Sequence, residues 1–372
     1  MNHSLRSILL RLLLAGYLPF LLLLCCLVCW GIWRLGQLYW LLPNVPTLLL
    51  IGGLAATVGQ VVWTSRVLFQ SIDADDDLEV RLPRKQLQGL NDLIVDVARR
   101  QQLPTADQIR LSADTVAYIY ENDDSESILV IGGLAIRMFS RDALAGIVAH
   151  ELTHLANGDT RLARRAANRV ALMAALEAEF QERLSSQVNP LVWLIRLYHL
   201  LFRIVRAAHS RAQERAADRS TAALLGKEAA AAALIRLTVT ERLPYVRLTS
   251  VAKSCVATGD TLDGIFAEQQ ARLRSIGAGE WKEALEKELR ADTDWFASHP
   301  ALRDRLGALG VPPKQALQLV LSDAGAAGAT LFADWARIEQ DLTARVIAVY
   351  QERQEAMRTF AQIVRGRPLN ER

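Results

Sequence analysis

The sequence predicts an α+β fold that is mostly helical and that follows N-terminal transmembrane helices. Three observations support this prediction. Apolar residues make up 51% of the 372 residues, and the longest uncharged runs lie near the N-terminus. Two strand-like runs, residues 115–120 and 127–139, follow in the first half of the chain. Beyond Ser140 the apolar residues recur only at helical spacing, so we expect a small sheet near the start of the soluble domain.

The net charge and the cysteines limit the partners that this chain is expected to have. A net charge of +3 is too small to indicate nucleic acid, and no basic patch is interleaved with aromatic residues. Three of the four cysteines lie in the first apolar run, and Cys255 stands alone. We therefore expect no disulfide framework, which suits a reducing compartment. The expected partner is a lipid bilayer and not nucleic acid, and the oligomeric state stays open.

Residues 1–70 are predicted to form a membrane anchor of two helices, at about 12–33 and 41–63. The first run carries no charge and is long enough to cross the hydrocarbon layer. The second run contains Pro, Asn and Gln, but Trp40 and Trp63 bracket it as interfacial anchors do. A cleaved signal peptide is the alternative for the first run. Its apolar part is too long for that, and no small-residue cleavage site follows it.

Basic residues around the anchor predict its orientation. Arg6 and Arg11 precede the first helix, and only Arg34 lies between the two helices. Further basic residues follow the second helix: Arg66, Arg81, Arg84 and Lys85. Since positive charge is retained on the cytoplasmic side, both ends of the anchor and the main domain are expected there. If only one helix spans, the main domain is on the other side. We interpret the acidic run at 73–77 as a solvated linker.

Residues 71–310 are predicted to form the main domain. An amphipathic helix is expected over 84–101, and the polar segment "ENDDSE" predicts a hairpin between the two strand-like runs. Residues 311–372 are expected to form a helical extension with a long helix at about 331–365. That helix could clamp the domain or mediate pairing.

The stretch "GIVAHELTHLANGD" predicts a metal site on a helix. Ser140 is a suitable N-cap and Asn157–Gly158 an end signal, so residues 141–156 should form one helix. On it His150 and His154 stack on one face, one turn apart, where both can reach one ion. Glu151 projects about 100° away, where it can act as a general base without binding the metal. The alternative is a pair of helix histidines with no metal.

A catalytic zinc ion needs a third protein ligand and one open position. A Glu followed four residues later by an Asp would be suitable, because the Asp can orient a ligand histidine from the same helix face. Downstream of His154 two pairs fit, Glu214 with Asp218 and Glu288 with Asp292. The alanines around Glu214 permit close packing, so we choose Glu214. A surface charge is the alternative for this residue.

Three separated motifs, "HELTH", "SRAQERAAD" and "SHPALRDRLGAL", resemble those of the membrane zinc metallopeptidases that include HtpX and the CAAX prenyl protease. The likeness covers roughly residues 80–310. It implies a zincin-like metallopeptidase domain of the gluzincin type and one zinc ion per chain. It implies zinc bound by His150, His154 and Glu214, with Glu151 as the catalytic base. The other implied site residues are Asp218 beside a ligand, His299 near the metal as a further catalytic residue, and Arg305 in the same motif as His299.

The resemblance also implies a substrate-binding edge strand at Gly132, Gly133 and Leu134, which a peptide could extend by main-chain hydrogen bonds. The alternative is an ordinary sheet edge. Two features depart from the family pattern. Residues 116–118 read Val-Ala-Tyr in place of an Asn-Ala-aromatic segment. Residues 189–209 form a basic amphipathic pattern in place of a clean membrane span; they could lie on the membrane, cover the site or pack in the core.

These expectations combine into a membrane-anchored zinc endopeptidase that acts on peptide or protein substrates. The resemblance implies a multi-pass protein of a bacterial inner membrane, with membrane-protein quality control as its role. One alternative is a non-catalytic zinc-binding membrane protein, such as a chaperone or sensor. The other is a membrane scaffold in which the HExxH motif is accidental.

Overall fold

The computed structural model describes residues 3–65, 78–113, 117–122, 124–181, 189–243, 246–258, 264–292, 299–322 and 328–364. The chain forms two compact units. Unit 1 comprises Met1–Ala74, Arg161–Ala212 and Trp295–His299. Unit 2 comprises Asp75–Thr160, Gln213–Asp294 and Pro300–Arg372. Unit 1 is therefore larger than the anchor predicted at 1–70, because it also takes in a middle segment of the chain.

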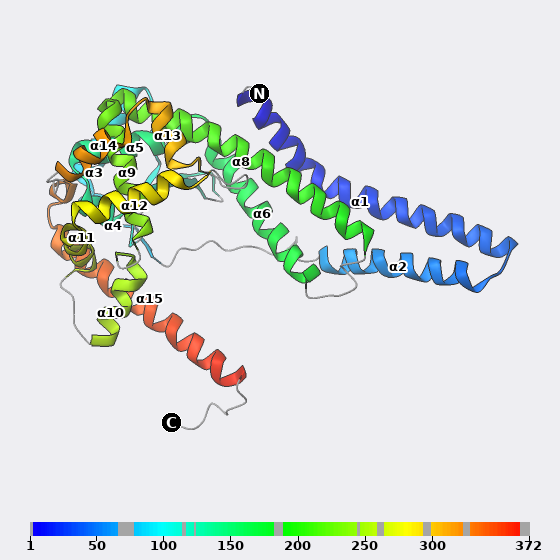
Figure 1. The fold of residues 1–372 in the computed structure, drawn as a ribbon. Coiled ribbons are helices and arrows are strands. Elements are labelled where there is room, and N and C mark those ends of the chain that lie inside the picture. Colours follow the sequence, from blue (N-terminus) through cyan, green and yellow to red (C-terminus); the bar gives the residue numbers. More distant parts are fainter. Residues whose placement is uncertain are drawn as a thin grey trace. The chain divides into compact units, whose positions relative to one another are not determined.

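Unit 1 contains the two N-terminal helices, α1 (His3–Leu41) and α2 (Val45–Ser65), which lie side by side and antiparallel (Figure 1). Asn44 begins α2, since its side-chain oxygen accepts a hydrogen bond from the backbone N–H of Thr47 at 2.8 Å. The stretches Leu5–Leu41 and Val45–Trp63 are long and apolar enough to cross a membrane. Both predicted helices are thus present, and the first is longer than expected.

Most of α6 (Asp159–Gln181) and the first part of α8 (Pro190–Leu225) complete unit 1. Their inward faces share an apolar core with α1. The largest buried side chains of this core come from all three helices: Tyr17, Phe180 and Phe202. The segment predicted as basic and amphipathic, 189–209, is thus part of a packed helical unit.

Unit 2 is built on a four-stranded sheet with the order β1-β2-β4-β3. Strand β4 is parallel to β2 and antiparallel to β3, and β1 is antiparallel to β2. All six residues of β4 are buried, as expected for a strand with neighbours on both sides. The bounds of the strands are β1 Glu79–Val80, β2 Gln108–Ser112, β3 Ala117–Glu121 and β4 Ser127–Gly132.

The predicted hairpin is confirmed, because β3 pairs with β4 from Ala117↔Ile131 to Glu121↔Ser127. Asn122 stabilises the connection by accepting a hydrogen bond from the backbone N–H of Glu126 at 2.9 Å. Residues 115 and 116 of the strand predicted at 115–120 lie outside the described residues. Strands β1 and β2 were not predicted; β1 has two residues, and the polar–apolar alternation of β2 extends over five residues only.

The prediction of one strand over 127–139 is wrong beyond Gly132. The chain turns there into the short helix α4 (Gly133–Met138). A short apolar run fits a buried strand and a buried helix equally well, so its period does not separate the two. The prediction of a substrate-binding edge strand at Gly132, Gly133 and Leu134 is also wrong, because these residues do not form an edge of the described sheet. Gly132 ends an interior strand that is paired on both sides, and Leu134 is a buried helix residue.

Gly133 is required where α4 begins, because the ring of Phe266 lies against its backbone. A Cβ atom at this position would lie 2.3 Å from Cε2 of Phe266, which is fully buried. We expect Gly133→Ala to destabilise the protein by about 1–3 kcal/mol through overpacking. Gly279→Ala is the control, since a Cβ there meets nothing within 4 Å. Urea unfolding of the detergent-solubilised chain, followed by circular dichroism, measures both; equal midpoints for the two variants would contradict this reading.

The first two long helices of unit 2 are α3 (Gln88–Gln101) and α5 (Arg141–Ala156), which pack against each other. The predicted apolar face of α3 is confirmed, with Leu90, Leu93, Ile94, Val97 and Ala98 buried. The helix begins four residues later than expected. Residues 84–87 form hydrogen-bonded turns after Pro83 instead.

The remaining elements of unit 2 are helical, and no strand follows β4 in the part of the chain that the structure describes. They are α9 (Lys227–Arg242), α10 (Leu248–Thr258), α11 (Ile265–Ser275), α12 (Ala278–Arg290), α13 (Leu302–Leu309), α14 (Pro313–Ser322), the 3-10 helix η2 (Gly328–Leu331) and α15 (Trp335–Val364). The start of α15 packs into the main core through Trp335, Ile338, Leu342 and Val346. Residues from 311 onward therefore belong to the same compact unit as the main domain.

Candidate metal centre

Helix α5 carries the two histidines of the HExxH motif, and its bounds confirm the predicted helix over 141–156. The side chain of Ser140 caps it by accepting a hydrogen bond from the backbone N–H of Ala143. Gly158 follows the helix with a φ of +66°, a left-handed conformation that glycine adopts without strain. The rings of His150 and His154 lie 5.1 Å apart on one face of the helix.

The second part of α8 brings Glu214 and Asp218 to this face of α5. Both carboxylates are buried, with exposed fractions of 4% and 6%. The two helices approach closely at Gly146, where a Cβ atom would lie 2.3 Å from Cδ1 of Leu225. Thr221 joins them by donating a hydrogen bond to the backbone oxygen of Gly146 at 3.1 Å. The small residue on α5 thus allows the acidic side chains of α8 to reach the histidines.

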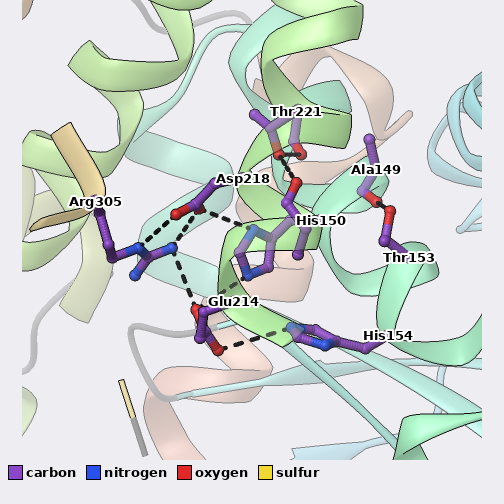
Figure 2. Close-up of polar contacts among 10 residues, drawn as sticks. Ala149, His150, Thr153, His154, Glu214, Asp218, Thr221 and Arg305 are labelled. Carbon is purple, nitrogen blue, oxygen red and sulfur yellow. Dashed lines mark hydrogen bonds and ion pairs between the residues drawn. The ribbon is translucent and has the colours of Figure 1, made fainter. Parts of the chain in front are cut away.

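Figure 2 shows that the side chains of His150, His154 and Glu214 converge. The distance from Nε2 of His150 to Oε2 of Glu214 is 3.6 Å, and Nε2 of His154 lies 3.8 Å from Oε1 of Glu214. One ligand atom from each residue lies within 4.8 Å of the other two. Bonds of zinc to nitrogen and oxygen in a tetrahedral site separate the ligand atoms by about 3.4 Å. Among the described residues, this group can therefore hold a metal ion.

Asp218 and Arg305 lie next to His150 and Glu214, respectively (Figure 2). Oδ1 of Asp218 lies 3.5 Å from Nδ1 of His150, the ring nitrogen that faces away from Glu214. Arg305 binds Asp218 in a bidentate manner, with Nε at 2.8 Å and Nη2 at 2.6 Å from the two carboxylate oxygens. The same Nη2 lies 3.3 Å from Oε2 of Glu214. Arg305 thereby fixes the positions of both carboxylates.

The electrostatics of the site favour a positive charge at His150. Burial by itself lowers the pKa of His150, but the contact with Glu214 and the charge of Glu151 outweigh it, so the pKa is raised. Arg305 is the opposing positive charge, and Asp218 and Glu214 raise its pKa despite burial. The carboxylates of Asp218, Glu214 and Glu151 thus all raise the pKa of a single guanidinium. A cation bound between the histidines and Glu214 would balance the excess negative charge.

Comparison with known proteins identifies the family. The sequence pattern of peptidase family M48 matches residues 84–311, which is more than half of the chain. The chain belongs to peptidase family M48. The match covers the HExxH helix, the Glu214–Asp218 segment and Arg305. The family resemblance expected from the three motifs is therefore confirmed, and the chain is a protease.

Relatives of this M48 chain carry the names of proteases. Protease HtpX of Actinobacillus pleuropneumoniae serotype 5b (strain L20) is 24% identical over 277 residues, covering 70% of this chain and 84% of the relative. A protease HtpX homolog of Salinibacter ruber is 28% identical over 144 residues, covering 37% of this chain and 51% of the homolog. The crystal structure of S. mikatae Ste24p matches with a TM-score of 0.31 and 15% identity, covering 83% of this chain and 66% of that chain.

The structure of the M48 chain places most of the predicted site residues in unit 2. It brings His150, His154, Glu214 and Asp218 together, with Glu151 on the same helix close enough to affect the pKa of His150. His299 is exposed and belongs to unit 1, so its catalytic role stays a prediction. The two-carboxylate contact of Arg305 and the helix contact at Gly146 were not predicted. Gly146 on the HExxH helix was the sequence signal that could have indicated the close contact between the helices.

Proposed function

We propose that this chain is a membrane-anchored, zinc-dependent endopeptidase whose metal ligands are His150, His154 and Glu214. The observation that supports this most directly is the convergence of the three side chains from α5 and α8. Two imidazoles and one carboxylate form a donor set typical of catalytic zinc, which leaves a fourth position for water or substrate. Asp218 would orient the ring of His150 from its other nitrogen, as carboxylates do beside ligand histidines.

The catalytic roles follow from the chemistry of these groups. A zinc ion held there supplies a Lewis acid that polarises the scissile carbonyl and lowers the pKa of water. Glu151 accepts a proton from the attacking water and delivers it to the leaving amine. Arg305 and Asp218 hold Glu214 and His150 in place, so little reorganisation is needed during the reaction. His299 is proposed as a further catalytic group by resemblance alone.

A peptide substrate would bind by extending the sheet at β3. Among the described strands, β3 has β4 as its one neighbour, so its outer edge has main-chain groups that can pair with an extended peptide. Strand β3 also packs against α5, the helix of the HExxH motif. This edge replaces the one predicted at Gly132–Leu134, where the interior strand β4 ends and helix α4 begins.

Zinc content and proteolysis, measured together, test the proposed function. We expect the full chain, purified in detergent, to contain one zinc ion and to cleave unfolded casein internally. Removal of the metal with a chelator should abolish cleavage, and added zinc should restore it. Purified protein that contains no metal, or that contains zinc but never cleaves, would contradict the proposal; the second result would support the non-catalytic zinc-binding alternative.

We also propose that the protease domain faces the cytoplasm of a bacterium from its inner membrane, with damaged or unassembled membrane proteins as substrates. The basic residues on either side of the two apolar helices support this orientation. The substrate class rests on the family resemblance. Protease added outside intact spheroplasts should leave the domain whole, whereas its digestion there would contradict the orientation.

Arg305 provides a test of the metal centre that leaves all three ligands intact. We expect Arg305→Gln to weaken zinc binding by about ten- to hundredfold, because Glu214 and Asp218 lose the guanidinium that fixes them. Arg305→Lys should have an intermediate effect, since it keeps the charge and loses the bidentate contact. Chelator competition measures the affinity. Arg272→Gln is the control, because this partly exposed arginine pairs with Glu268 on α11; equal zinc affinity for both Gln variants would refute this role of Arg305.

A further inference from the structure

The first part of α8, residues 190–208, has an apolar outer face, and its inward face carries the buried His199 in addition to apolar core residues. Five large apolar side chains are 41–58% exposed: Trp193, Leu194, Leu197, Leu200 and Leu201. At 100° per residue they fall within an arc of about 120°, and no charged residue between Trp193 and Leu201 lies inside that arc. An apolar patch of this size on a helix marks a surface that meets another apolar phase.

Three ionisable groups at this level of unit 1 contact one another: the buried His199 and the partly exposed Glu177 and Arg196. His199 is 4% exposed, and its two ring nitrogens lie 2.8 Å from the hydroxyl of Tyr17 and 3.0 Å from Oε1 of Glu177. Nε of Arg196 donates to Oε2 of the same Glu177 at 3.1 Å. The Arg196–Glu177 pair carries no net charge. Each of these polar groups thus has a protein partner, which lowers the cost of an apolar surrounding.

Polar contacts with α1 and α2 fix the direction of α8. Arg6 donates to the backbone oxygen of Ala208, and Tyr198 donates to that of Leu13, so α8 runs antiparallel to α1. At its first residues, the side chain of Asn189 donates to Gln60 of α2, three residues before the end of the apolar stretch at Trp63. The N-terminal end of α8 therefore lies beside the two helices that can cross a membrane. Its later residues lie beside the N-terminal end of α1.

We propose that the first part of α8 is inserted in the membrane, with its apolar face against acyl chains and its N-terminal end deepest. The exposed leucines of α8 lie in the same compact unit as those of α1, whose Leu18, Leu22 and Leu23 are 41–66% exposed. The lipid surface that contacts α1 therefore continues onto α8. Arg196, Arg203 and Arg206 keep α8 from being a full span, and it is not among the helices apolar enough to cross. It enters one leaflet beside α1 instead.

Spin labels in proteoliposomes test the depth of α8. The four cysteines are first replaced by serine, and Leu194, Leu197 and Leu201 are then changed to cysteine one at a time and labelled. Leu22→Cys on α1 is the lipid control, and Lys282→Cys on α12 is the water control. We expect all three α8 labels to be reached by oxygen more than by a water-soluble nickel chelate. Their depths should decrease in the order 194, 197, 201.

Two outcomes would overturn the proposal. Nickel access equal to that of the Lys282 label would place the face in water. Protection from both reagents would mean that protein covers it, such as a second copy of this chain or a bound substrate. Labelling of the unmodified full chain by a photoreactive lipid, with peptide mapping by mass spectrometry, gives the same answer without substitutions. Failure of the lipid to label residues 193–201, while it labels α1, would also reject membrane insertion.

Discussion

Replacement of Glu151 by glutamine is expected to reduce proteolysis by about a hundredfold to ten-thousandfold, the usual contribution of a general base. Glutamine has nearly the same shape and cannot accept the proton of the attacking water. Because Glu151 lies outside the group of ligand atoms formed by His150, His154 and Glu214, the variant should keep its zinc. Initial rates of casein cleavage, with zinc content measured on the same samples, check both parts of this prediction.

The control for this variant is Glu286→Gln on α12, a carboxylate that is 46% exposed and pairs with Arg290. This change should leave the rate unaltered. A Glu151→Gln variant that cleaves at the rate of the unmodified chain would show that Glu151 is not the base. If the unmodified chain binds zinc and does not cleave, the non-catalytic alternative gains support and the role of Glu151 must be reconsidered.

Replacement of Glu214 by alanine is expected to remove zinc and activity together. A ligand contributes more than a residue that merely orients one, so the affinity for zinc should fall by more than about a hundredfold. The change also removes one of the two carboxylates that Arg305 contacts at the site, so the positive charge of Arg305 then opposes a cation more strongly. Zinc content after gel filtration and the rate of casein cleavage measure the effect.

Glu288→Ala is a matched control, because Glu288 also precedes an aspartate by four residues. In the structure Glu288 contacts Arg242, a largely exposed side chain, and is not part of the group that can hold a metal. We expect this variant to keep zinc and activity. The opposite pattern, with zinc lost in Glu288→Ala and kept in Glu214→Ala, would show that Glu214 is not the third ligand.

The bounds of the HExxH helix followed from local sequence. Ser140, Asn157 and Gly158 predicted the bounds of α5 because capping depends on side chains within a few residues. The one-turn spacing of His150 and His154 likewise follows from helix geometry alone. The β3–β4 hairpin was predicted by a short polar connection, which is also a local feature.

Long-range contacts decided what local sequence left open. The apolar run 127–139 fits a strand or a helix, and packing of Gly133 against Phe266 accompanies its change to a helix at that residue. The interior position of β4 depends on β2, whose residues pair with those of β4 that lie 20 positions later in the chain. For 189–209, sequence gave three possible environments, and only the contacts with α1 and α6 show which face is turned inward.

The sequence by itself determined that this chain has two apolar N-terminal helices, a hairpin and a helix that presents two histidines on one face. These features depend on residues less than about two helical turns or one hairpin apart. Only the tertiary structure decided that Glu214 and Asp218 reach those histidines and that Arg305 binds both carboxylates. These contact partners are 60 to 91 residues apart in sequence. Their proximity arises from the packing of separate helices, which spacing along the chain does not encode.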